Sequence, residues 1–190
     1  GIVLLKNEGS LPMAKRGKIL VMGPNADRIA TGGGSGFVTP ISSVSVYQGL
    51  VDAKGAKNVT LLSDDMLYKD IYSEIFTDET FSARGFKAAY YPNKKFEGEP
   101  VMERIDGRID FHWKYSSPCK GLPDDGFCAR WEGVYKPAQD GTLRFRMSGD
   151  DGYRIIVNGK QIGGDWGNHS LSSKSAFMDV KAGQTYNFRF

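Results

Sequence analysis

Cysteine, histidine and net charge are all scarce in this chain of 190 residues. It contains two Cys and two His, and its formal net charge is +3. The Cys and His residues lack the spacing of a structural zinc site, which takes four ligands. The Lys and Arg residues form no basic block, which argues against a nucleic-acid partner. No run of about 18 apolar residues occurs, so the sequence predicts no membrane span.

Glycine and aromatic residues are abundant instead. The chain has 24 Gly and is 12% aromatic. With 40% hydrophobic and 25% charged residues, it is otherwise typical of a soluble globular protein. This composition suits β-structure with tight turns, and it also suits contact with carbohydrate.

The first eighty residues carry the pattern of an α/β unit. An apolar run at 18–22 predicts a strand, and residues 42–53 place apolar side chains at helical spacing. A second apolar run spans 58–63, after which Asp64-Asp65 would cap a second helix that runs on to Ile75. The order strand, helix, strand, helix predicts a parallel βαβ unit with a right-handed crossover.

From Gly85 onward the apolar period changes to two, which is typical of strands. Asn158-Gly159 between two apolar runs predicts a two-residue hairpin. Short strands separated by Gly, Pro and Asp turns favour a β-sandwich. We expect a boundary within 77–85, with one domain at 1–80 and another at 85–190. The expected strands are Phe86–Tyr91, Ile105–Trp113, Phe127–Tyr135, Thr142–Ser148, Tyr153–Val157, Ala176–Val180 and Thr185–Phe190.

Three segments near the start of the chain resemble family 3 glycoside hydrolases. They are residues 1–12 (GIVLLKNEGSLP), 18–26 (KILVMGPNA) and 32–36 (GGGSG). In that family this passage joins the catalytic barrel to a second, α/β sandwich domain. The resemblance implies that residues 1–80 are the start of that domain.

The later segments resemble the β-sandwich first named from anthrax protective antigen. They include residues 85–91 (GFKAAYY), 129–133 (ARWEG) and 148–153 (SGDDGY). This module is inserted in the second domain of some β-glucosidases. The implied fold is the α/β start of an α/β sandwich domain followed by an all-β sandwich insert. Because the chain ends on a strand-like pattern, we expect the insert to be incomplete at the C-terminus.

The resemblance implies part of a retaining β-glucosidase that removes terminal β-glucosyl residues from oligosaccharides or glucosides. Retention requires two carboxyl groups about 5–5.5 Å apart. The family's nucleophile context, Ser-Asp-Trp, is missing from these residues, and the acid/base normally follows the insert. We therefore expect both catalytic carboxylates to lie outside this fragment, which should be inactive alone and needs no cofactor. The expected partners are the β-glucoside or oligosaccharide, the catalytic barrel and the rest of the second domain.

A different class of function also fits the sandwich. It could be a stand-alone carbohydrate-binding module or adhesin, with or without calcium. In related yeast adhesin modules, paired Asp residues at the position of Asp150 and Asp151 coordinate calcium, which in turn holds sugar hydroxyls. Calcium takes 6–8 oxygen ligands, so loop carbonyls, an Asn or waters would have to complete the shell. The alternative for Asp150-Asp151 is a turn closed by Gly152.

Two loops are candidates for substrate contact. In the resembling family the loop with Gly33, Gly34 and Ser35 approaches the mouth of the active site, and glycine lets its backbone come close to a partner surface. The alternative is a plain flexible connection. By the same resemblance Trp166, Asn168 and His169 would shape the leaving-group subsite. The alternatives are a core position for Trp166 and a solvated His169.

Cys119 and Cys128 could form a disulfide or remain two free thiols. A disulfide would indicate an oxidising compartment and so favour the periplasm or secretion. The sequence leaves the compartment, the oligomeric state and the sugar specificity open.

Overall fold

The computed structural model describes two compact units, residues 1–69 and residues 70–190. The described residues are 3–14, 16–23, 25–29, 40–63, 68–113 and 116–190. Each unit has its own hydrophobic cluster or clusters. Within these ranges, none of the helices has the length and apolar character needed to cross a bilayer.

Unit 1 contains a parallel pair of strands, β1 (Ile19–Met22) and β2 (Val59–Leu62). Between them in sequence come the helix α1 (Val46–Lys54) and the short 3₁₀ helix η2 (Ala56–Asn58). The helix begins where its N-cap Ser45 accepts a hydrogen bond from the Gln48 amide at 3.0 Å. Such a cap satisfies an amide that the helix itself leaves unpaired. The expected strand, helix and strand at the start of the chain are therefore present.

Among the residues that the structure describes, one face of this small sheet is covered by packed side chains. Val21, Ala26 and Val59 are its buried apolar residues, and α1 packs against them through Tyr47, Leu50 and Val51. Because strand side chains alternate between faces, Leu20 and Met22 point the other way, and they are 57% and 63% exposed.

The second helix predicted for the first unit is wrong over the residues that the structure describes. Tyr72–Glu74 forms the 3₁₀ helix η3, and Ile75–Phe76 forms the strand β3. Ile75 is 1% exposed and belongs to the core of unit 2. The apolar residue that suggested a helix face is thus a sandwich core residue. Asp64 and Asp65, the expected caps, lie outside the described residues.

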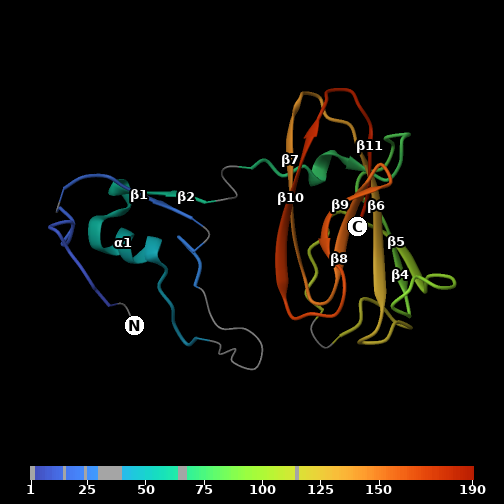
Figure 1. The fold of residues 1–190 in the computed structure, drawn as a ribbon, viewed down its shortest axis with the longest axis horizontal. Helices are drawn as coiled ribbons and strands as arrows, with labels where there is room; N and C mark the ends of the chain where they lie inside the picture. The colour runs from blue at the N-terminus through green and yellow to red at the C-terminus, as the bar shows by residue number, and fades with distance from the viewer. Residues whose placement is uncertain (1–2, 15, 24, 30–39, 64–67, 114–115) are drawn as a thin grey trace. The chain divides into compact units, whose positions relative to one another are not determined.

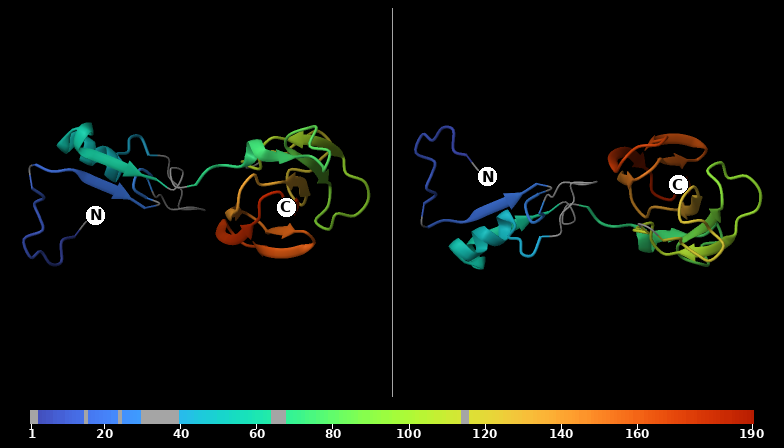
Figure 2. Two further views of the ribbon diagram at one scale, coloured as in Figure 1. Left: turned by 90° about the horizontal axis from the view of Figure 1, so that it is seen from above. Right: turned by 90° about the horizontal axis from the view of Figure 1, so that it is seen from below.

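Unit 2 is a β-sandwich. One sheet has the order β5-β4-β6-β11-β8-β9, with β3 also paired to β6, and the other is the antiparallel pair β10-β7. Figure 1 shows β7 and β10 as a layer beside the larger sheet, and Figure 2 shows the two sheets nearly end-on. The strands are β4 (Phe86–Tyr91), β5 (Met102–Asp106), β6 (Cys128–Tyr135), β7 (Gly141–Gly149), β8 (Tyr153–Val157), β9 (Lys160–Asp165), β10 (Ser172–Val180) and β11 (Tyr186–Arg189).

The predicted hairpin is confirmed, and one predicted strand is wrong for most of its length. Asn158 and Gly159 have φ values of 48° and 79° and join β8 to the antiparallel β9, as a type I′ turn requires.

The strand expected at 105–113 stops at Asp106. Beyond it, the alternating aromatics Phe111 and Trp113 stack on each other at 4.9 Å in an irregular segment.

The main core of unit 2 includes side chains from both sheets. Phe86 and Phe188 come from the larger sheet and Phe145 from the smaller one, with the rings of Phe145 and Phe188 at 5.4 Å. Gly133 allows this packing, since a Cβ there would lie 2.7 Å from Ile75 and 2.8 Å from Phe86. The sandwich is therefore closed by large apolar side chains packed against a glycine.

Unit 2 has a second apolar cluster around Ala88, Tyr90 and Leu122, and the buried carboxylate of Asp106 bonds to it. The carboxylate oxygens accept hydrogen bonds from Tyr90 Oη at 2.6 Å, Arg104 Nε at 2.6 Å and Trp131 Nε1 at 2.9 Å. Asp106 is 8% exposed and Tyr90 is fully buried. Burial, followed by the neighbouring Asp106, raises the pKa of the Tyr90 hydroxyl. This network ties the end of β5 to β4 and β6.

Candidate functional site

The β7–β8 loop (150–152) and the β9–β10 loop (166–171) meet in unit 2. The backbone amide of His169 donates to Asp151 Oδ1 at 3.0 Å. Gly152 lets the two backbones come this close, because a Cβ there would lie 2.8 Å from the amide nitrogen of Gly167. The structure therefore brings one of the two predicted Asp residues beside the predicted Trp166–His169 segment. We refer to these two loops, residues 150–152 and 166–171, as the paired-loop site.

His169 is held in place rather than solvated on a free loop. Its Nδ1 lies 2.8 Å from the Ser170 carbonyl and its Nε2 lies 3.3 Å from the Asp165 carbonyl. Its ring also meets the Tyr153 ring edge-on at 5.9 Å. Hydrogen bonds to the two carbonyls raise the pKa of the imidazole, because only the protonated ring can donate from both nitrogens.

Asp165, the last residue of β9, is held by side chains of the next strand, β10. Its Oδ2 pairs with Lys174 Nζ at 3.2 Å and accepts from Ser172 Oγ at 3.2 Å. The bond from Lys174 lowers the pKa of Asp165. Tyr153 Oη lies 3.0 Å from the Ser172 hydroxyl, so the start of β10, where the β9–β10 loop ends, is tied to both β8 and β9.

Trp166 lies on the surface of this site. It is 53% exposed, so the interpretation of Trp166 as a core residue is wrong. The guanidinium of Arg154 lies 4.1 Å from the centre of its ring, a geometry that favours cation–π attraction. Asn168 is also exposed. An aromatic ring and an amide are thus available to a ligand at the paired-loop site.

The described residues give only partial support for calcium at Asp150 and Asp151. Both side chains are exposed, and the peptide bond between them is cis. Nowhere in the described ranges do three His, Cys, Asp or Glu side chains gather as a metal site would require. One oxygen of Asp151 is already engaged by His169. Two carboxylates supply too few of the 6–8 oxygens that calcium needs, so calcium coordination stays a prediction.

The other predicted residues are those of the glycine loop and the two cysteines. Gly33, Gly34 and Ser35 lie outside the described residues. Cys119 and Cys128 are both free thiols and half-buried. Burial raises the pKa of the Cys128 thiol. Of the two alternatives for the cysteines, the structure has the free thiols.

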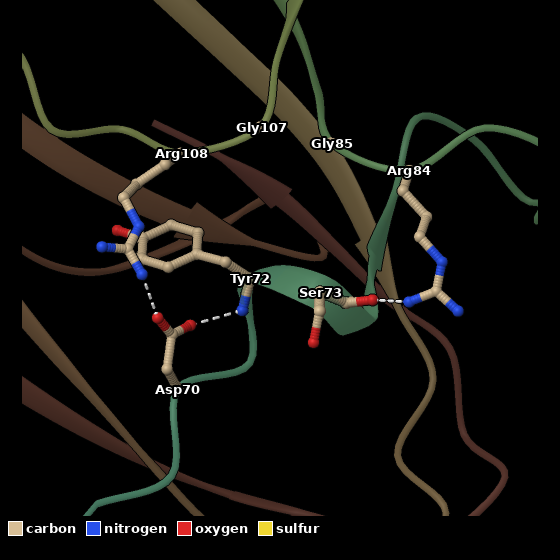
Figure 3. Close-up of a pocket in the computed structure, with 7 residues that line it drawn as sticks. All are labelled: Asp70, Tyr72, Ser73, Arg84, Gly85, Gly107 and Arg108. Carbon is tan, nitrogen blue, oxygen red and sulfur yellow. Dashed lines mark hydrogen bonds and ion pairs between the residues drawn. The ribbon is translucent and has the colours of Figure 1, made fainter.

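A pocket of about 490 Å³ was not foreseen from the sequence. Figure 3 shows Arg108 on one side of Tyr72 and Ser73 and Arg84 on the other, with Gly85 and Gly107 on the backbone segments above them. Arg108 bonds to Asp70, and Arg84 donates to the Ser73 carbonyl. These residues come from three separate segments with no motif in common, so no local pattern could have identified the pocket.

Comparison with known proteins separates the two parts of the chain. The PA14 domain family matches residues 82–190. An anti-sigma-I factor, RsgI3 of Acetivibrio thermocellus, is 30% identical over 105 residues, covering 55% of this chain and 16% of that protein. A β-glucosidase of Rhizobium radiobacter is 31% identical over 169 residues, covering 85% of this chain and 19% of the enzyme.

A solved structure extends the likeness to nearly the whole chain. The β-glucosidase of Kluyveromyces marxianus in complex with glucose matches with a TM-score of 0.52 and 25% identity. The match covers 98% of this chain and 24% of that one. The chain thus spans about a quarter or less of the β-glucosidases that it resembles.

Proposed function

This chain belongs to the PA14 domain family through residues 82–190, and we propose that it is part of a retaining β-glucosidase of glycoside hydrolase family 3. In this proposal residues 1–69 begin the second, α/β sandwich domain, and the PA14 sandwich is an insert within it. The substrates are glucosides or oligosaccharides with a terminal β-glucosyl residue. The catalytic barrel and the rest of the second domain are the partners of this segment.

The extent of the β-glucosidase match carries this proposal. The match to the anti-sigma-I factor covers 55% of the chain, whereas the matches to β-glucosidases cover 85% and 98%. A stand-alone sandwich explains only the shorter match. The longer ones also include the βαβ segment that precedes the PA14 domain, in the same order.

The role we propose for the paired-loop site is contact with the substrate beyond the scissile bond. Cleavage with retention needs a nucleophile and an acid/base about 5–5.5 Å apart, and we place both outside this chain. The indole of Trp166 can pack on the C–H face of a sugar, while Asn168 and the His169 ring can meet its hydroxyls. The ties from Asp151, Asp165 and Tyr153 hold the loop in one shape, which lowers the entropy cost of binding.

The first test is hydrolysis by the chain alone. The purified 190-residue chain is expected to release no nitrophenol from 4-nitrophenyl β-D-glucoside above the buffer blank. The Rhizobium radiobacter enzyme serves as the positive control. Turnover by the chain at an enzyme-like rate would contradict the assignment of both catalytic carboxylates to other segments.

The second test addresses the paired-loop site in the whole enzyme that contains this chain. Trp166→Ala should raise KM for cellobiose or an aryl glucoside by about tenfold, with a smaller change in kcat, because it removes binding rather than chemistry. Phe177→Ala is the matched control, since Phe177 is 63% exposed on β10. Equal effects of the two substitutions would argue against a substrate contact at Trp166.

A third test separates this proposal from a calcium-dependent adhesin. Calorimetry of the chain with methyl β-D-glucoside is run with and without calcium, in wild type and in Asp151→Asn. We expect no calcium-dependent binding of the sugar. Tight binding that needs calcium and is lost in Asp151→Asn would favour the adhesin.

A further inference from the structure

The pocket between Arg84 and Arg108 lies outside the paired-loop site and has a distinct chemistry. Its lining contains two guanidinium groups and one carboxylate, that of Asp70. The lining side chains therefore carry one net positive charge. A volume of about 490 Å³ falls in the range of sites that hold small molecules.

Both guanidinium groups are positioned before any ligand arrives. Arg108 bonds to Asp70, and its guanidinium lies 4.8 Å from the centre of the Tyr72 ring. Arg84 donates to the Ser73 carbonyl and lies 5.1 Å from the centre of the Phe76 ring. Asp70 is fixed in turn by accepting from the Tyr72 amide at 2.6 Å. Each guanidinium has five N–H donors, so each keeps donors for a ligand.

Besides Tyr72 and Ser73, the lining includes two glycines, Gly85 and Gly107. Gly85 is required where it is: its φ is +109°, and a Cβ would lie 2.8 Å from Ile105 and 2.9 Å from the Asp106 carbonyl. Gly107 is different, because its φ is unremarkable and a Cβ there would meet no atom within 4 Å. The fold therefore does not require glycine at position 107, and a larger side chain can be introduced there.

We propose that this pocket binds a sugar bearing one negative charge, either a uronate or a sulfate monoester. Guanidinium groups bind planar and tetrahedral oxyanions through paired hydrogen bonds. A ligand with a single negative charge neutralises the net charge of the lining side chains. A phosphate dianion would leave one unbalanced negative charge in the pocket, which also contains the Asp70 carboxylate. The Asp70 carboxylate can accept from a sugar hydroxyl, which favours a hydroxylated ligand over a bare anion.

The test is binding to the 190-residue chain, measured by calorimetry with four probes. Methyl β-D-glucuronide and glucose 6-sulfate should bind at millimolar concentration, while methyl β-D-glucoside and glucose 6-phosphate should bind at least about tenfold more weakly. Equal binding of the neutral glucoside, tighter binding of the phosphate, or no binding of either monoanion would each overturn the proposal. Hydrolytic activity plays no part in this readout, so its outcome is independent of the proposed glucosidase.

Three variants separate a ligand site from a purely structural contact. Arg84→Gln and Gly107→Leu should each weaken glucuronide binding by about tenfold or more, since one removes a charged donor and the other fills the space. Both should melt within a few degrees of wild type. Arg189→Gln, which removes an exposed guanidinium on β11 instead, should bind glucuronide unchanged. Unchanged binding in Arg84→Gln and Gly107→Leu would overturn the proposal, whatever their melting temperatures.

Discussion

Residues 1–69 and residues 70–190 bury apolar surface in very different ways. Unit 2 closes two sheets over a core that includes Phe86, Phe145 and Phe188. Among its described residues, unit 1 has Val21, Ala26 and Val59 as its buried apolar side chains, and Leu20 and Met22 on the other face of its strand pair are exposed. Parallel strands normally have both faces covered. The difference teaches that the sandwich has the core expected of an independent domain, whereas the described part of unit 1 buries little apolar surface of its own.

The largest expected effect comes from separating the two units. Residues 70–190 expressed alone should unfold in one cooperative transition in urea, followed by tryptophan fluorescence. Residues 1–69 alone should show no cooperative transition by circular dichroism, because so small a core cannot offset the entropy of ordering the chain. A sharp transition for residues 1–69 would break the comparison.

Within the sandwich, the core should be sensitive to the loss of one ring. Phe188 is 3% exposed and its ring lies 5.4 Å from that of Phe145. Phe188→Ala should lower the free energy of unfolding by about 3–5 kcal/mol, measured by urea denaturation of the full chain. Leu20→Ala in the open face of unit 1 is the control, with an expected change within about 0.5 kcal/mol.

A smaller loss is expected from the buried carboxylate. Asp106→Ala leaves Arg104, Tyr90 and Trp131 without their shared acceptor, which should cost about 2 kcal/mol in the same urea experiment. Glu103→Ala is the matched control on the same strand, since Glu103 is exposed. If the two substitutions cost the same, the network does not contribute to the stability of the sandwich.

The smallest effect concerns an exposed carboxylate that links two turns. The bond from Lys181 and the amide of Ala182 lower the pKa of Asp140. A lowered carboxyl pKa stabilises the fold above the unfolded-state value, and this contribution is lost as the pH falls through the folded-state value. Wild type should therefore melt higher than Asp140→Asn at pH 7, and the difference should shrink below about pH 4. A difference that stays constant with pH would contradict this origin.

Local patterns predicted much of the secondary structure. Strands β4 and β8 occupy the predicted residues, because short apolar runs bounded by turn residues are typical of buried strands. The prediction failed where an apolar residue had a partner far away in sequence. Ile75 suggested a helix face but packs in the sandwich core, and Phe111 and Trp113 alternate without forming a strand.

The candidate sites were predicted less completely than the fold. The Trp166–His169 segment was identified by a resemblance, and its exposure and its tie to Asp151 came from the structure. The sequence did not identify Arg154 as part of the site. Nothing near Arg154 in the sequence indicates that its guanidinium will lie over the indole of Trp166. The lining of the Arg84–Arg108 pocket was missed for the same reason.

By itself, the sequence determined the helix after Ser45, the Asn158-Gly159 hairpin and the two-residue period of the sandwich strands. Caps, turns and alternation act over a few neighbouring residues, so they can be read along the chain. Only the tertiary structure decided which donors surround Asp106, which loop meets Asp151, and that Arg84 and Arg108 share a pocket. Those contacts join residues far apart in sequence, and they exist only once the sheets have packed.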